Sequence, residues 1–148
     1  MRDEFVKYLT SLGMGDVLLG RVTYLERSIA AVCPEELKYV FADDIVQQDG
    51  SRQYQGLFFF SDNYAIAASN FVSQDRFEMD EIGNSIVYLE FDSSEFDFKA
   101  PTEKSRLRVR YVTGTQLQAY MSASQENCMH LLEIVRSCLV PNFVRQSK

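Results

Sequence analysis

The chain has 148 residues and a formal net charge of −6, from 15 Lys and Arg against 21 Asp and Glu, and 46% of its residues are hydrophobic. This length and apolar content suit one globular domain with a sizeable core. The acidic balance excludes general nucleic-acid binding, because such binding depends largely on Lys and Arg neutralising phosphates. No apolar run approaches the roughly 18 to 20 residues of a spanning helix, and the amino terminus lacks the basic and apolar regions of a secretory signal. We therefore expect a soluble, cytoplasmic protein.

The first 34 residues predict a helical hairpin. In residues 2–12, the spacing i, i+3, i+4, i+7 of one helical face is occupied by Phe5, Tyr8, Leu9 and Leu12. Asp16 can cap a second helix, which Pro34 cannot continue. Residues 1–34 are therefore expected to precede a main body, 35–148, with which they form one compact unit.

The apolar face of the first helix has to be buried somewhere. One alternative is that it packs on the sheet of its own chain. The other is that it packs on a second copy, in which case Phe5, Tyr8, Leu9 and Leu12 lie in a symmetric homodimer interface. The sequence leaves both alternatives open.

From Leu37 onward, short runs rich in Tyr, Phe, Val and Ile alternate with turn residues, which is typical of successive antiparallel strands. The expected strands are 37–47, 53–60, 64–69, 75–80, 85–91, 106–111 and 116–121, and 96–99 is expected to be an edge strand or a loop. The turns between them are expected at Asp49-Gly50, Ser61-Asp62-Asn63, Gly83-Asn84 and Thr113-Gly114. Gly83-Asn84 in particular is expected to join two paired strands as a hairpin.

A final amphipathic helix is predicted over residues 125–139, with Ser124 at its head and Pro141 ending it. Such a helix can cover the open end of a bent sheet. The predicted fold is therefore α+β: a bent antiparallel sheet or partly open barrel of about seven strands, closed by a C-terminal helix and preceded by two N-terminal helices.

Two segments resemble the pleckstrin-homology-like superfold, in particular its bacterial PH-like and GRAM-type members. The first is residues 54–66, which have the order glycine, apolar strand, Ser-Asp turn, apolar strand. The second is the closing order of strand, strand and helix over 106–139. The similarity covers roughly residues 35–140, although the chain lacks the Trp that many members carry in the closing helix. It implies lipid binding, peptide binding or scaffolding, since the superfold hosts all three.

Lipid headgroup binding is not expected, because in the superfold it depends on basic residues around the first hairpin. That hairpin here has three acids, Asp43, Asp44 and Asp49, and a single Arg52. A basic cluster lies outside this hairpin. Its members alternate along one predicted strand, which puts Arg106, Arg108 and Arg110 on one face with Lys104 on the same side.

This basic face has two interpretations. It is a binding site for an anion or an acidic peptide, or it is a solvated face whose arginines pair with acids of neighbouring strands, such as Glu90 and Asp92. We retain Arg106, Arg108, Arg110 and Lys104 as candidate partner-binding residues.

Catalytic and metal chemistry have little support in the sequence. His130 is the only histidine, and no pattern places a nucleophile beside it. Cys33, Cys128 and Cys138 lack a metal-binding spacing and are expected to be reduced thiols, mostly buried. We predict no catalytic residue, no metal and no cofactor. An enzyme would need carboxylates such as Asp43 and Asp44 to lie in a cleft.

The sequence thus favours a non-enzymatic protein-binding or assembly module that recognises a protein partner by surface contacts. The expected surfaces are the basic strand face and an exposed sheet edge, where an extended peptide can add a strand. A small acidic chaperone-like homodimer is the alternative, and an enzyme is the third hypothesis.

Overall fold

The computed structural model describes residues 1–96, 99 and 104–144, and its elements confirm the predicted α+β class. The helices are α1 (Asp3–Ser11), α2 (Asp16–Val32) and α3 (Asn127–Ile134). The strands are β1 (Tyr39–Val46), β2 (Arg52–Phe60), β3 (Tyr64–Ser69), β4 (Glu78–Glu81), β5 (Ile86–Glu95), β6 (Arg106–Thr113) and β7 (Gln118–Ser124). After α3 the chain continues in a π-helical turn over Val135–Leu139 and a 3-10 turn over Val140–Asn142. None of the helices in the described residues is long and apolar enough to cross a membrane.

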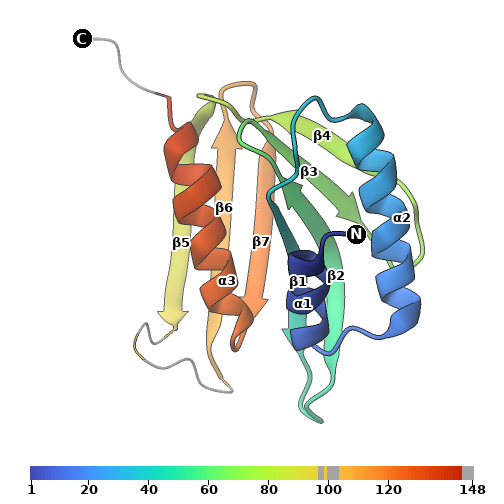
Figure 1. Cartoon of the computed structure of the whole chain (residues 1–148). Coiled ribbons are helices and arrows are strands. Elements are labelled where there is room, and N and C mark those ends of the chain that lie inside the picture. Colours follow the sequence, from blue (N-terminus) through green and yellow to red (C-terminus); the bar gives the residue numbers. More distant parts are fainter. Residues whose placement is uncertain (97–98, 100–103, 145–148) are drawn as a thin grey trace.

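The strands form two antiparallel sheets that do not close into a barrel. One sheet has the order β1-β2-β3-β4 and the other the order β5-β6-β7. β1 and β7 lie side by side where the sheets meet, and α3 lies across β6 and β7 (Figure 1). The two N-terminal helices lie at the four-stranded sheet, which places all three helices away from one face of the three-stranded sheet.

The four-stranded sheet lies between two apolar cores. Alternation along β1 sends Phe41 into one core and Val40 and Ala42 into the other. The first core also holds the inner residues of the three-stranded sheet and the apolar side of α3, and the second core holds the apolar sides of α1 and α2. The segment 57–60 is buried on both faces of its strand.

Most strand predictions agree with the structure, but the hairpin predicted at Gly83-Asn84 is wrong. β4 pairs with β3 and β5 pairs with β6, so the two strands around this turn belong to different sheets. The turn is held by Asn63, whose carbonyl oxygen accepts hydrogen bonds from the backbone N–H groups of Ile82 and Gly83. A side chain at Gly83 would collide with the amide of Asn63, which explains the glycine without any hairpin.

Two further predictions change at the ends of elements. Ser124 is the last residue of β7 and does not cap the final helix, which begins at Asn127. Of the segment 96–99, which was expected to be an edge strand or a loop, Phe96 and Lys99 lie outside the strands, and 97–98 lie outside the described residues.

Candidate functional site

The three predicted arginines share the outer face of β6. Their neighbours Leu107 and Val109 point into the first core, so alternation turns Arg106, Arg108 and Arg110 to the opposite side. We call these three residues the arginine face. Lys104 is exposed and precedes β6.

Acidic residues of β5 lie opposite two of these arginines. The strand register pairs Glu90 with Arg110 and Asp92 with Arg108. The corresponding ion-pair distances are 3.6 Å from Arg110 Nη2 to Glu90 Oε2 and 3.5 Å from Arg108 Nη1 to Asp92 Oδ2. Both contacts are long and partly exposed, and such pairs contribute about 0 to 1 kcal/mol. The pairing expected from the sequence is therefore present, but it is weak.

Two exposed tyrosines flank Arg110. Its guanidinium carbon lies 4.9 Å from the ring centre of Tyr88 and 5.8 Å from that of Tyr120. The two tyrosines are 42% and 63% exposed, so neither ring serves the core. Tyrosine and arginine are the residue types most enriched among the energetically dominant residues of protein interfaces.

A groove of about 390 Å³ runs along this face, lined by the three arginines, by Glu90 and Asp92 of β5, and by Tyr120 and Ser122 of β7. Its far wall comes from the four-stranded sheet, through Ile45 of β1 and Gln55 of β2. Gln55 has no partner in β1, because Asp43 pairs with Gly56 and Asp44 with Tyr54. The groove therefore lies where the two sheets meet.

Arg106 differs from the other two arginines. Its Nε is buried and has no hydrogen-bond partner, and no ion pair involves it in the described part of the chain. Its register partner in β5 is Glu95. Asp43 of β1 interacts with Arg106 through its charge.

A second polar cluster lies between β1 and the elements α1, α3 and β7, and it provides hydrogen-bond partners for the free edge of β1. Its members are Tyr8, Asp44, Ser124, Asn127 and His130, which we call the edge network. The hydroxyl of Tyr8 accepts the backbone N–H of Ala42 at 3.0 Å, and the side-chain amide of Asn127 donates to the Ala42 carbonyl at 2.8 Å. Tyr8 also donates to Asn127 Oδ1 at 2.6 Å. Side chains thus replace the missing strand partner of β1.

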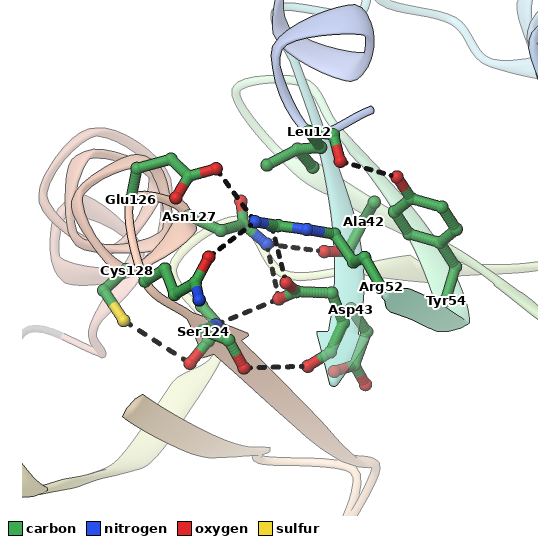
Figure 2. A network of polar contacts seen from close by, with 12 residues as sticks. Leu12, Ala42, Asp43, Arg52, Tyr54, Ser124, Glu126, Asn127 and Cys128 are labelled. Carbon is green, nitrogen blue, oxygen red and sulfur yellow. Dashed lines mark hydrogen bonds and ion pairs between the residues drawn. The ribbon is translucent and has the colours of Figure 1, made fainter. Parts of the chain in front are cut away.

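Asp44 is the centre of the edge network and is fully buried. Its partners Arg52, Ser124 and Asn127 are labelled in Figure 2. It accepts hydrogen bonds from the backbone N–H of Ser124 at 3.0 Å and from the side chain of Asn127 at 2.8 Å. Arg52 forms an ion pair with it at 2.7 Å and reaches on to Glu126 at 2.8 Å. The single arginine of the first hairpin is therefore a structural partner, and Asp44 has no free position for a substrate.

The edge network was not predicted as a unit. The sequence predicts Asp43 and Asp44 as acids of the first hairpin and as the carboxylates that an enzyme would need in a cleft. Both interrupt an otherwise apolar strand, a pattern that indicates buried carboxylates. Tyr8 was assigned to an apolar helical face, and nothing in the sequence shows that Asn127 faces it across the sheet edge.

His130 and Cys128 are both held in structural contacts. The Nε2–H of His130 donates to the Val40 carbonyl at 2.7 Å, and its ring stacks on Tyr8 with centres 3.7 Å apart. Burial lowers the pKa of His130, which favours the neutral ring. Burial raises the pKa of the Cys128 thiol to about 11, so Cys128 is not a thiolate at neutral pH.

Burial also raises the pKa of Asp43 to about 7, although the backbone N–H of Ser122 and the charge of Arg106 act against that rise. Asp43 is therefore only partly ionised near neutral pH. Burial raises the pKa of Asp44 as well, and the hydrogen bond from Asn127 and the charge of Arg52 oppose it.

The apolar face of α1 packs on the sheet of its own chain, which was the first of the two alternatives. Phe5, Leu9 and Leu12 are buried against the second core of their own chain, and Tyr8 contacts β1 and α3. These side chains are consequently not a free surface for a second copy.

Cys33, Cys128 and Cys138 are free thiols, and the last two are buried. Within the residues that the structure describes, His, Cys, Asp and Glu side chains form no group of three that suits a metal ion.

No family model matches the sequence, and neither a curated protein nor a solved structure matches the chain. The site therefore has to be interpreted from its own geometry.

Proposed function

We propose that this protein is a non-catalytic binding module that recognises an acidic, extended segment of a partner protein on the arginine face. The observation that carries the proposal is the groove of about 390 Å³, in which three arginines and an exposed tyrosine meet on a sheet face left open by the helices.

The spacing of the arginines defines the partner segment. Alternate residues of a strand lie about 6.6 Å apart on one face. An extended segment with Asp or Glu at every second position presents carboxylates at the same spacing. The existing pairs with Glu90 and Asp92 are weak enough to be exchanged for partner carboxylates, since exposed pairs contribute little.

Binding also suits the rest of the molecule better than catalysis does. Asp44 and His130 are committed to structural hydrogen bonds, and the Cys128 thiol donates to the Ala123 carbonyl at 3.4 Å. Of the functions that the PH-like resemblance implies, peptide binding is the one that the arginine face supports.

Charge reversal tests the proposal. The probe is a fluorescein-labelled, C-terminally amidated peptide of alternating Glu and Ser, whose carboxylates are all on side chains, and the readout is fluorescence anisotropy. We expect the double variant Arg108→Glu, Arg110→Glu to bind the probe at least about tenfold more weakly, because like charges placed opposite each other cost several kcal/mol.

The matched control is Arg27→Glu, Arg76→Glu, which changes the net charge equally at two exposed positions outside the groove. This control should bind as the natural chain does. Equal weakening in both double variants would mean that overall charge and not the arginine face governs binding, and unchanged binding in both would refute the proposed function.

A further inference from the structure

Arg106, which lines the groove, has a hydrogen-bond donor without an acceptor. Its Nε–H is buried without an acceptor in the described residues. A buried donor without an acceptor costs about 1 to 3 kcal/mol, so such a group in a folded protein calls for an explanation. Arg106 also lines the groove, so that a movement of its side chain would present the Nε–H to a ligand atom.

The charge of Arg106 is also less compensated than that of its neighbours. Arg108 and Arg110 each have a carboxylate at 3.5 or 3.6 Å. Within the described residues, Glu95, the register partner of Arg106, forms no ion pair with it. Asp43 interacts with Arg106 by charge and is only partly ionised near neutral pH, because burial raises its pKa to about 7. Arg106 is thus the arginine of this face with the most to gain from an added carboxylate.

We infer that Arg106 is the anchor of the groove and receives a side-chain carboxylate of the partner segment through its Nε–H and a neighbouring Nη–H. This inference rests on the proposed function and specifies which arginine determines affinity. The planar guanidinium offers two parallel donors to one carboxylate, a geometry that a lysine ammonium does not provide. Arg108 and Arg110 then steer the segment and set its register.

Three single variants separate these roles with the same Glu-Ser probe. Arg106→Gln should weaken binding by about tenfold or more, and Arg106→Lys by several-fold, because the lysine keeps the charge but loses the paired donors. Arg76→Lys, the matched control at an exposed arginine outside the groove, should change affinity by less than about threefold. Thermal unfolding of each variant, followed by circular dichroism, shows whether it is folded.

A second measurement uses the natural chain and so does not depend on any variant folding well. In ¹H–¹⁵N spectra, the Arg106 Nε–Hε signal is assigned by its loss in Arg106→Lys. Titration with the probe should shift this signal more than those of Arg108 and Arg110 and slow its exchange with water.

The outcomes distinguish the two claims. If Arg108→Glu, Arg110→Glu weakens binding while both Arg106 variants bind normally and the Arg106 Nε–Hε signal is unmoved, the anchor is refuted and the proposed function stands. If none of these variants changes binding, the proposed function itself fails.

Discussion

At the scale of single residues, Asp43 is an acid whose pKa departs strongly from its ordinary value. It projects from β1 beside the groove, accepts a hydrogen bond from the Ser122 backbone at 3.2 Å, and has a pKa raised by burial to about 7. Its ordinary value is 3.8. Between these values the native state holds a proton that the unfolded state has lost, so the contribution of Asp43 to stability falls as the pH rises.

Asp43→Asn should remove this dependence, because the amide cannot ionise and its oxygen can still accept the Ser122 N–H. We expect the free energy of unfolding of the natural chain, relative to the variant, to fall by about 1 to 3 kcal/mol between pH 5 and pH 8. Urea unfolding of both proteins at the two pH values measures the difference, in which groups common to both, such as Asp44 and Asp80, largely cancel. Parallel pH profiles would contradict the burial of an ionisable Asp43.

At the scale of elements, the edge of β1 is satisfied by side chains from α1, α3 and β7. His130 binds the Val40 carbonyl, Tyr8 and Asn127 bind Ala42, and Ser124 donates to the Asp44 carbonyl at 3.4 Å. This arrangement holds the two sheets side by side without a backbone ladder. It also explains why the groove has a fixed wall on the β1 side.

Tyr8→Phe tests this role of the edge network. Removing the hydroxyl leaves the Ala42 N–H without its acceptor and Asn127 Oδ1 without its donor, which should lower the free energy of unfolding by about 1 to 3 kcal/mol. Chemical denaturation measures the loss, and amide exchange at Ala42 should quicken. Tyr24→Phe on the exposed side of α2 is the control and should change stability by less than about 0.5 kcal/mol. Equal effects in the two variants would argue against the edge network.

Local patterns predicted the elements well but not their long-range partners. The alternation in 106–111 and the turn at Thr113-Gly114 are local signals, and the β6–β7 hairpin follows from them. The turn at Gly83-Asn84 has the same local chemistry, yet the partner of β5 is β6, because strand pairing depends on which apolar faces meet in the core. Turn residues predict that the chain changes direction, but they do not predict which strand the next strand pairs with.

Local patterns likewise predicted one part of the candidate site and not the other. The common face of Arg106, Arg108 and Arg110 follows from strand alternation, and the acids opposite Arg108 and Arg110 were named from the sequence. The groove could not be predicted from the sequence, because its far wall comes from Ile45 and Gln55 of the other sheet. The contacts of Tyr8 with β1 and α3 join residues more than thirty positions apart, so no local pattern could show them.

At the scale of the whole molecule, the three helices leave the outer face of β5-β6-β7 uncovered (Figure 1). The chain as a whole carries a net charge of −6, which opposes an acidic partner at long range. Salt screens that repulsion beyond about 8 Å at physiological ionic strength, whereas contacts within the groove are much shorter. Binding is therefore expected to depend on local complementarity.

The most direct measurement is a ¹H–¹⁵N chemical-shift titration of the full chain with the amidated Glu-Ser peptide, which maps where an acidic extended segment binds. Binding at the arginine face predicts amide shifts concentrated in β6 and β7, with α1 and α2 unchanged. Shifts concentrated on α2 or β4, or no shifts at millimolar peptide, would contradict it.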